Sequence, residues 1–520
     1  MEVAGLVLSV VALFSSCLKG YQLVSDVKSG EHDSAILLCR LQIEEKRLMI
    51  WGKTVGLAEE TCRIPIQDID MIVTVLAEIN RRSSDEEEIR ISKALQSTWI
   101  FAVESTKKLR SPGQSLKNGL RWVFDRKNFE KLVVDLRELN NGLYALLEGA
   151  QRLSSLSRFN EICLLSSASD DVNRLAVIRD ASSTSYEGLS RTVDQRMHFF
   201  KLEQSSIEVP QLGTLIPVDQ LDWVRSESLR GIAHFEDEMV LVEWRGYADE
   251  NYDGQLVLTV LEQRIAELSV LLGRKPKPEG FQVMNCIGYC HDEPKQRFGL
   301  VYNLPVLEAD EPPEIVSLYD LIHSQADADK VFPSLNDRFL LSRILANSLL
   351  QLHTTCWLHR NLRSSHILFV KSGKSMDWLQ YPYLSGFGYS RLNNPKVVSL
   401  PVRPEDEEMA YQHPDLTDDP RVGYRRDYDA YSLGIILTEI GFWRPIFKFR
   451  KLDYSANRNH RRLLEYQLTG HLAHRMGQHF EQAAKLLLTG KAYGDSKVEG
   501  EQLIAFSRNI VSQLDIQNLH

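Results

Sequence analysis

The sequence lacks a hydrophobic run as long as a membrane span. Its N-terminal stretch Val3–Leu18 carries no charged residue, but Lys19 ends it after sixteen residues. Such a helix extends about 24 Å, less than the ~30 Å hydrocarbon core of a bilayer. A secretory signal is disfavoured, because Glu2 stands where a basic residue is expected and no small-x-small cleavage site follows. Since the helix is apolar nearly all round, we expect it in the core of an α-bundle, with conditional membrane entry as the alternative.

The chain also lacks an excess of positive charge and a paired set of cysteines. It carries 61 Lys and Arg against 70 Asp and Glu, a net charge of -9, which argues against general nucleic-acid binding. Its seven cysteines are scattered and odd in number, which favours free thiols in a reducing compartment. Cys286, Cys290 and His291 are close in sequence, but no second pair at zinc-site spacing accompanies them, so we expect no metal site.

Helical periodicity dominates the first 200 residues. Apolar spacing predicts helices over 35–51, 69–79 and 115–147. In the third, leucines at alternating spacings of four and three form a seam that needs partner helices: Leu132, Leu136, Leu139, Leu143 and Leu146. We therefore predict an all-α bundle over residues 1–200 and a linker over 201–220, with mobile turns between short helices in the serine-rich stretch 150–222.

Two motifs in this bundle resemble a known family. Arg47-Leu48-Met49-Ile50-Trp51-Gly52 and the stretch 120–132, which contains Arg-Trp-x-x-Asp-x-x-x-Phe, are similar to the fungal HeLo domain of the HET-S/LopB prion-inhibition-and-propagation family. In that family the apolar N-terminal helix is released on activation, inserts into membranes and kills the cell. The resemblance implies self-association through the bundle and a membrane-inserting role for Val3, Leu6, Val7, Val10, Leu13 and Phe14.

From residue 221 the pattern changes to strands followed by helices. Runs of β-forming residues predict strands over 239–244 and 298–304, with an amphipathic helix over 255–272 between them. Helices dominate after residue 318, and the helix over 339–353 leads directly into the stretch Leu358–Leu368. With the bundle, this makes a multidomain chain whose second domain, 221–520, is of the α+β class.

The second domain resembles a protein kinase. Leu358–Leu368 has the shape of a catalytic loop, with His359 and Arg360 in place, and Asp429–Ile440, which includes Gly434, resembles the buried helix that supports that loop. In kinases the residue matching Asp429 binds the backbone of the loop. The resemblance implies a two-lobed protein-kinase-like fold in which His359, Arg360, Asp429 and Gly434 are structural anchors.

The residues that would perform phosphoryl transfer are replaced. Kinases need a Lys on the phosphates, an Asp in the loop, and an Asn and an Asp as magnesium ligands. The matching positions hold Glu243, Asn361, His366 and Gly386, and no G-x-G-x-x-G precedes Glu243. An acid at 243 repels phosphates, and histidine is a poor ligand for magnesium. We expect a pseudokinase without catalytic residues, metal or cofactor, and metal-independent ATP binding stays open.

These expectations combine into one functional hypothesis. The chain is expected to be a fungal regulated-cell-death or heterokaryon-incompatibility effector, in which a pseudokinase controls a membrane-active bundle. Its expected partners are membrane lipids on activation and an unidentified upstream protein sensor, and its expected location is the cytoplasm, with conditional association with the plasma membrane. The alternatives are a non-lytic signalling scaffold that binds proteins and an atypical active serine/threonine kinase that binds ATP.

Overall fold

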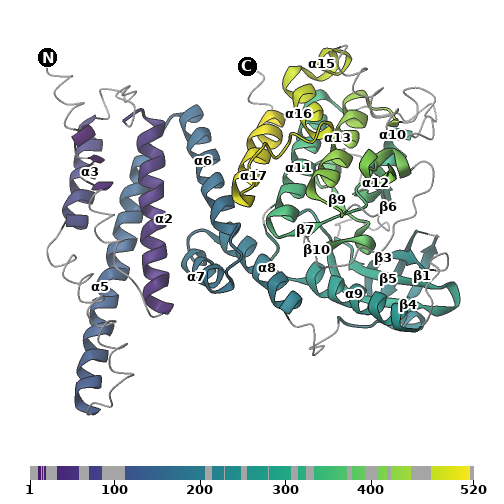
Figure 1. Cartoon of the computed structure of the whole chain (residues 1–520), viewed down its shortest axis with the longest axis horizontal. Coiled ribbons are helices and arrows are strands. Elements are labelled where there is room, and N and C mark those ends of the chain that lie inside the picture. The colour runs from purple at the N-terminus through teal and green to yellow at the C-terminus, as the bar shows by residue number, and fades with distance from the viewer. Residues whose placement is uncertain are drawn as a thin grey trace. The chain divides into compact units, whose positions relative to one another are not determined.

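The computed structural model divides into two compact units, Met1–Ser190 and Arg191–His520 (Figure 1). The first is called the N-terminal unit and the second the C-terminal unit. The structure describes residues 10–12, 14–15, 17–18, 32–57, 69–84, 112–204, 213–227, 229–247, 255–278, 280–305, 314–323, 333–371, 377–392, 408–418, 423–446 and 470–515.

The described part of the N-terminal unit is helical. Its elements are α2 (His32–Thr54), α3 (Ile69–Ser84), α5 (Pro112–Ala145), α6 (Gly149–Ser167), α7 (Val172–Ser182) and the start of α8 (Glu187–Gln204). The three helices predicted from periodicity correspond to α2, α3 and α5, which confirms them. The leucine seam of α5 faces the core: Leu132, Leu136 and Leu143 are buried, and Leu139 and Leu146 pack against them.

This core also contains the described residues of the apolar N-terminal stretch. Val10, Phe14 and Cys17 are buried in the same cluster as residues of α2, α3 and α5. The Cys17 thiol donates a hydrogen bond to the carbonyl of Leu76 on α3. The expectation that this stretch packs in an α-bundle is therefore confirmed for these residues. No helix that the structure describes is both long and apolar enough to cross a membrane.

In the serine-rich stretch, the predicted short helices are observed as α6, α7 and α8 up to residue 204, and turns separate them at residues 168–171 and 183–186. Two serine hydroxyls on these helices form hydrogen bonds within the unit: Ser155 donates to Thr54 Oγ1, and Ser182 donates to the carbonyl of Ile178. Asp171 caps the N-terminus of α7. The division between the units falls inside α8, earlier than the predicted end of the bundle at residue 200.

After the last turns of α8, the C-terminal unit has a five-stranded antiparallel sheet in the order β1-β2-β3-β5-β4. Its strands are β1 (Asp222–Ser226), β2 (Arg230–Phe235), β3 (Glu238–Gly246), β4 (Asn285–Asp292) and β5 (Arg297–Asn303). The helix α9 (Gln255–Gly273) packs against β4 and β5. β3, α9 and β5 confirm the two predicted strands and the helix between them. The predicted α+β class is thus observed.

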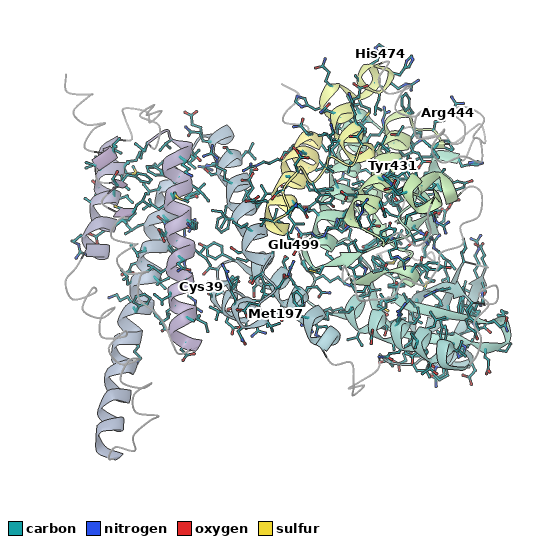
Figure 2. The ribbon with its side chains drawn as sticks, in the orientation of Figure 1. Cys39, Met197, Tyr431, Arg444, His474 and Glu499 are labelled. Carbon is teal, nitrogen blue, oxygen red and sulfur yellow. The ribbon has the colours of Figure 1, made fainter. Side chains whose placement is uncertain are left out.

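The rest of the C-terminal unit is mainly helical, with short strands. The helices are α10 (Leu318–His323), α11 (Leu335–Thr354), α12 (Pro414–Asp418), α13 (Arg426–Phe442), α15 (His471–Met476), α16 (Gln478–Leu488) and α17 (Glu499–Phe506). The strands are β6 (Glu314–Ser317), β7 (Trp357–Leu358), β8 (Ile367–Lys371), β9 (Tyr383–Leu384) and β10 (Arg391–Leu392). Figure 2 shows Tyr431 of α13 among densely packed side chains, and α13 is buried along nearly its whole length.

Candidate functional site

The stretch Leu358–Leu368 forms a loop that α13 holds in place. Asp429 accepts hydrogen bonds from the backbone N–H groups of His359 and Arg360, both at 2.8 Å. Asp429 is fully buried, and burial alone would raise its pKa, but its hydrogen bond from His353 and the backbone bonds lower it. The carboxylate therefore stays ionised and fixes the loop. The predicted contact between Asp429 and the loop backbone is confirmed.

The other three predicted anchors also have defined partners. His359 is buried and donates from Nε2 to the carbonyl of Ser385, because its Nδ1 accepts the N–H of Asn361. Arg360 adopts a left-handed φ of 68° and its guanidinium donates to the carbonyl of Tyr389. A Cβ at Gly434 would lie 2.9 Å from the Leu488 side chain, so the glycine allows α16 to approach α13 closely.

Glu243 lies on β3 and does not point into open solvent. It is buried, and Arg230 stands directly opposite on β2, with Arg230 Nη2 3.6 Å from Glu243 Oε1. Its other oxygen accepts the N–H of Gly386 at 2.7 Å. Glu243 thus joins the sheet to the segment around Gly386, and it is balanced by a cation from the neighbouring strand. This pairing was not evident from the sequence.

His366 and Gly386 fit together as one structural unit. Gly386 adopts a left-handed φ of 84°, and a Cβ there would lie 2.3 Å from Nδ1 of His366. The imidazole of His366 therefore occupies the space where a side chain at position 386 would begin. No carboxylate fits at position 386 while His366 keeps this position.

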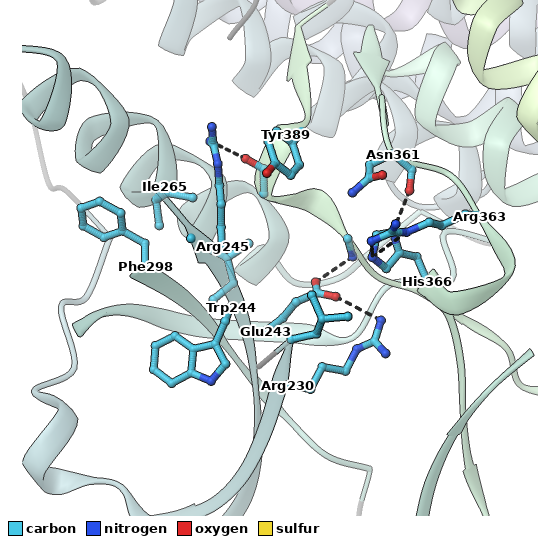
Figure 3. A pocket seen from close by; sticks show the side chains of 15 residues that line it. Arg230, Glu243, Trp244, Arg245, Ile265, Phe298, Asn361, Arg363, His366 and Tyr389 are labelled. Carbon is cyan, nitrogen blue, oxygen red and sulfur yellow. Dashed lines mark hydrogen bonds and ion pairs between the residues drawn. The ribbon is translucent and has the colours of Figure 1, made fainter. Parts of the chain in front are cut away.

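The protonation state of His366 follows from its contacts. Burial and the nearby guanidiniums of Arg363 and Arg230 hold its pKa well below the usual value, so the ring is neutral. Nδ1–H donates to the carbonyl of Asn361 at 2.7 Å, and Nε2 accepts from Arg363 at 3.0 Å. The ring is thus hydrogen-bonded to two residues of the loop, one through each nitrogen (Figure 3). In this state it has no lone pair left for a cation.

A cavity of about 190 Å³ lies beside Glu243 and His366. Three arginines line it: Arg230 from β2, Arg245 from β3 and Arg363 from the loop. Arg245 donates to the carbonyl of Gly388 at 2.7 Å and lies over the ring of Tyr389, as Figure 3 shows. The carboxylate among the lining residues is Glu243, so the lining carries more positive than negative charge.

Sequence reasoning identified Glu243, Asn361, His366 and Gly386, which all line this cavity, but it missed the arginines. Two features of the sequence weakly indicated Arg245 and Arg363. Residues 243 and 245 share one face of a strand because side chains alternate with a period of two. Arg363 lies within the loop motif itself. The pairing of Arg230 with Glu243 depends on the register of β2 and β3, which no local pattern reveals.

The described residues hold no group of three or more His, Cys, Asp or Glu side chains suited to a metal ion. Cys286 and Cys290 lie buried on β4, where burial raises the pKa of each thiol to about 12. His291 stacks on Phe298, with ring centroids 4.2 Å apart. These three residues therefore pack as ordinary strand residues.

The second candidate site is the packing of the N-terminal stretch in the bundle. The ring of Phe14 lies over Gly52, where a Cβ would come within 2.1 Å of it, and 6.4 Å from the ring of Trp51. The indole of Trp51 donates to the carbonyl of Leu143 on α5. The Trp-Gly pair thus forms a seat for Phe14. Of the predicted membrane-inserting residues, Val10 and Phe14 are buried here, and Val3, Leu6, Val7 and Leu13 lie outside the described residues.

Comparison with known families gives two matches. Residues 3–178 match the HeLo family, described as prion-inhibition and propagation. Residues 291–486 match a family described as a domain of unknown function, DUF7580. No curated protein matches the chain. The HeLo resemblance is confirmed over residues 3–178, whereas the protein-kinase fold of residues 221–520 stays a prediction.

Proposed function

With residues 3–178 forming a HeLo domain, we propose that the chain is a fungal cell-death or heterokaryon-incompatibility effector. In this proposal the bundle acts on membranes, and the C-terminal unit is a kinase-like control domain without phosphoryl-transfer activity. The observation that carries it is the burial of Val10 and Phe14, which are 0% and 5% exposed. Apolar residues buried in a protein core must leave that core before they can contact a lipid bilayer. In this proposal, release of the N-terminal stretch from the bundle core therefore controls membrane activity.

The kinase-like part of the proposal is supported by the arrangement of the C-terminal unit. A five-stranded antiparallel sheet with α9 against it precedes a mainly helical part, and Asp429 of a buried helix fixes the loop 358–368 through its backbone. The lack of catalysis is supported by His366 and Gly386, which leave no oxygen ligand for magnesium at either position. Incubation of the full chain with labelled ATP and magnesium should produce no autophosphorylation. Phosphate transfer that is lost on Asn361→Ala would contradict this part.

The proposal places the resting protein in the cytoplasm. On a signal from an upstream protein, the bundle self-associates and its N-terminal stretch meets lipids of the plasma membrane. A fluorescent fusion of the full chain should move from cytosol to plasma membrane on activation. Deletion of residues 2–20 should abolish this movement without preventing protein partners from binding, which separates the proposal from a non-lytic scaffold.

Release of Phe14 from its seat provides the main test. Gly52→Leu places a side chain where the Phe14 ring lies, so it should expel the N-terminal stretch from the core. Gly142→Leu is the matched control, because Gly142 is exposed on α5 and a Cβ there meets nothing within 4 Å. Leakage of a dye from vesicles that contain anionic lipid should be several-fold faster with Gly52→Leu than with wild type or Gly142→Leu.

The result that would overturn the proposal is equally specific. If Gly52→Leu loses the native signal of the bundle but causes no more leakage than Gly142→Leu, even after crosslinking into oligomers, the exposed stretch does not act on membranes. Combining Gly52→Leu with deletion of residues 2–20 should return leakage to the wild-type rate. Leakage that persists after this deletion assigns the activity to another part of the chain.

A further inference from the structure

The turn between α7 and α8 presents three hydroxyl side chains in a row. It comprises residues 183–186, in which Ser183 and Thr184 are exposed and Ser185 is partly exposed. We propose that Ser185 is a phosphorylation site and that Arg137 of α5 binds the phosphate. The inference goes beyond the proposed membrane activity, because it assigns a covalent modification that fastens this turn to α5. Its effect is read from the stability of the N-terminal unit, so it holds or fails independently of membrane leakage.

Arg137 already contacts the oxygen that would carry the phosphate. Its Nη1 donates a hydrogen bond to Ser185 Oγ, and its side chain is 27% exposed. The neighbouring Glu138 lies 3.9 Å from Arg137 Nε and is 67% exposed, and an exposed pair of this kind contributes little. A phosphate on Ser185 therefore replaces Glu138 with little loss. A guanidinium donates two parallel hydrogen bonds to phosphate oxygens, each stronger than its bond to a neutral hydroxyl.

The two neighbouring hydroxyls lie in less favourable positions for a phosphate. Ser183 donates to the carbonyl of Asp180 at 2.9 Å, at the C-terminal end of α7, where the negative end of the helix dipole repels a phosphate. Thr184 Oγ1 lies 3.4 Å from the neutral Ser185 Oγ. Ser185 instead precedes the N-terminal end of α8, which is positive, and it also has the guanidinium contact. Among these three hydroxyls, the geometry therefore favours Ser185.

The acidic groups beside the turn do not cancel this attraction. The carboxylate of Asp180 pairs with Arg179 at 2.8 Å, so its charge is balanced. Glu187 is exposed in the first turn of α8, where water and salt screen its repulsion. The contact between Arg137 and Ser185 is screened less, because the guanidinium side chain is largely buried. The net effect on a phosphate at Ser185 is therefore attractive.

The phosphate adds a second attachment to a turn that α2 already holds. The hydroxyl of Tyr186 donates to the buried carboxylate of Glu44 on α2 at 2.7 Å. Burial and this carboxylate raise the pKa of Tyr186 above its ordinary value, so the hydroxyl stays protonated and donates. The phosphate and Arg137 attach the same turn to α5. The modification therefore joins α2, α5 and the start of α8, and it stabilises the folded bundle.

The phosphate comes from ATP through a separate protein kinase, because the C-terminal unit is proposed to lack this activity. Ser185 Oγ attacks the γ-phosphorus of ATP, and a bond between that oxygen and phosphorus forms. The bond between the γ-phosphorus and the bridging oxygen of ADP breaks, and ADP leaves. The hydroxyl proton passes to a base of the kinase. At neutral pH the product carries a charge of about -1.5 to -2 beside Arg137.

The first test locates the modification. The full chain is purified from resting fungal cells and digested with trypsin, which cuts after Arg179 and Arg191 and releases residues 180–191. Mass spectrometry with fragmentation should find a phosphate on Ser185, and Ser185→Ala should remove it. A peptide without phosphate from both resting and challenged cells, or a phosphate confined to another residue of this peptide, overturns the proposal.

The second test measures the effect of the phosphate. Phosphoserine is incorporated at position 185 of the full chain during translation, and calorimetry follows the unfolding of the N-terminal unit. The melting temperature should rise by about 3–6 °C, because the phosphate forms charge-assisted hydrogen bonds with a largely buried guanidinium. Arg137→Gln should abolish this rise, and Arg137→Lys, which keeps the charge, should retain part of it. Phosphoserine at position 183 is the matched control and should not raise the melting temperature.

The melting temperatures decide the proposal whatever a vesicle assay shows. A rise that disappears in Arg137→Gln and persists in part in Arg137→Lys supports the contact. Circular dichroism of the unmodified Arg137→Gln chain should match that of wild type, so that loss of the rise is not loss of the fold. An unchanged or lowered melting temperature with phosphoserine at position 185 overturns the proposal. So does a rise that Arg137→Gln leaves intact, or an equal rise with phosphoserine at position 183.

Discussion

At the scale of single residues, the glycine at position 386 and the histidine at position 366 depend on each other. The left-handed φ of Gly386 suits glycine, and the imidazole of His366 fills the space beside it. Two departures from the kinase pattern, which sequence comparison treats as independent losses, are thus coupled by direct contact. The imidazole in turn braces Asn361 and accepts from Arg363, so the ring nitrogens are committed to bonds within the loop.

This contact predicts non-additive energetics. Gly386→Asp should lower the free energy of unfolding of the C-terminal unit by about 2–4 kcal/mol, because it forces a Cβ against the imidazole and a side chain into a left-handed conformation. In the double variant with His366→Asn the clash is relieved. Its loss of unfolding free energy should therefore be smaller than the sum of the two single-variant losses, by at least ~1 kcal/mol. Urea unfolding of the wild type, Gly386→Asp, His366→Asn and the double variant measures this difference. Strict additivity would show that the two positions do not touch.

A second residue-scale prediction concerns Glu439, a carboxyl that is fully buried on α13. Burial raises its pKa to about 7, although hydrogen bonds from the N–H of Ile446 and the hydroxyl of Tyr411 lower it in part. Its folded-state pKa therefore exceeds its ordinary value of 4.5. The protonated carboxyl contributes stability that is full below about pH 4.5 and is lost as the pH rises through about 7.

Glu439→Gln removes this titration. The free energy of unfolding of the variant, relative to wild type, should therefore increase between about pH 5 and pH 8, by up to ~3 kcal/mol. Thermal unfolding of both proteins across this range is the measurement. Asp415→Asn is a suitable control, because Asp415 is about half exposed on α12. A difference between variant and wild type that does not change with pH would mean that Glu439 stays ionised.

Motif comparison predicted single positions well but not their surroundings. Asp429 was predicted to bind the loop backbone, and it does so with both oxygens. Glu243 was predicted as an acid facing phosphates, yet it is paired with Arg230 and bonded to Gly386. The difference arises because the pairing depends on strand register and on a contact across 143 positions of sequence, and neither leaves a local pattern.

At the scale of elements, the close packing of α13 and α16 depends on Gly434. In an exposed helix a change from glycine to alanine usually adds about 0.5–1 kcal/mol of stability. Here a Cβ would lie about 3 Å from Leu487 and Leu488, so Gly434→Ala should instead cost about 1–3 kcal/mol. Gly423→Ala is the control, because a Cβ there meets nothing within 4 Å. A raised melting temperature in Gly434→Ala would contradict this packing.

Another element-scale prediction concerns how α8 is held within the C-terminal unit. Arg196 on α8 is fully buried and donates to Glu499 on α17 and to the carbonyl of Thr354. Arg426 of α13 binds the same carboxylate. Burial would raise the pKa of Glu499, but Arg426 and Arg196 hold it below its usual value. Figure 2 shows Glu499 at the start of α17 among the packed helices.

Glu499→Gln leaves two buried guanidiniums without their carboxylate and should cost about 3 kcal/mol. Glu227→Gln breaks an exposed pair with Arg225 and should cost less than ~1 kcal/mol. Because the pKa of Glu499 is depressed, its contribution is present at neutral pH and is lost as the pH falls below about 4.5 and through the folded-state pKa. Chemical denaturation at about pH 7 and pH 4 measures both effects. Equal costs for the two variants at neutral pH would contradict the buried network.

Periodicity predicted the long helices well, whereas composition did not locate the short helices of the serine-rich stretch. The apolar spacing in α2, α5 and α11 reflects a buried face, which is a property of local sequence. Serine content suggested mobile turns between short helices over 150–222, and Ser155 and Ser182, which lie in two of these helices, bond to neighbouring groups within the bundle. Composition alone did not reveal that the surrounding helices provide partners for these hydroxyls.

At the scale of the whole molecule, the chain has two units with separate cores. The N-terminal core joins Phe14, Trp51 and Leu143, whereas the C-terminal unit is built around its sheet and α13. Calorimetry should therefore show two unfolding transitions. Phe14→Ala should destabilise the N-terminal unit by about 3–5 kcal/mol and lower the temperature of its transition alone, and Gly434→Ala should lower only the other. One transition shifted equally by both variants would contradict separate cores.

The seat of Phe14 also has a consequence for synthesis on the ribosome. Phe14 is synthesised before its seat, which needs Gly52 and Trp51, and the indole of Trp51 is fixed by Leu143. At about 5–20 residues per second, the nascent chain takes on the order of 10 s to reach Leu143 after Phe14. During that interval the Phe14 side chain has no finished core to enter. Slower translation between positions 14 and 143 would lengthen this interval.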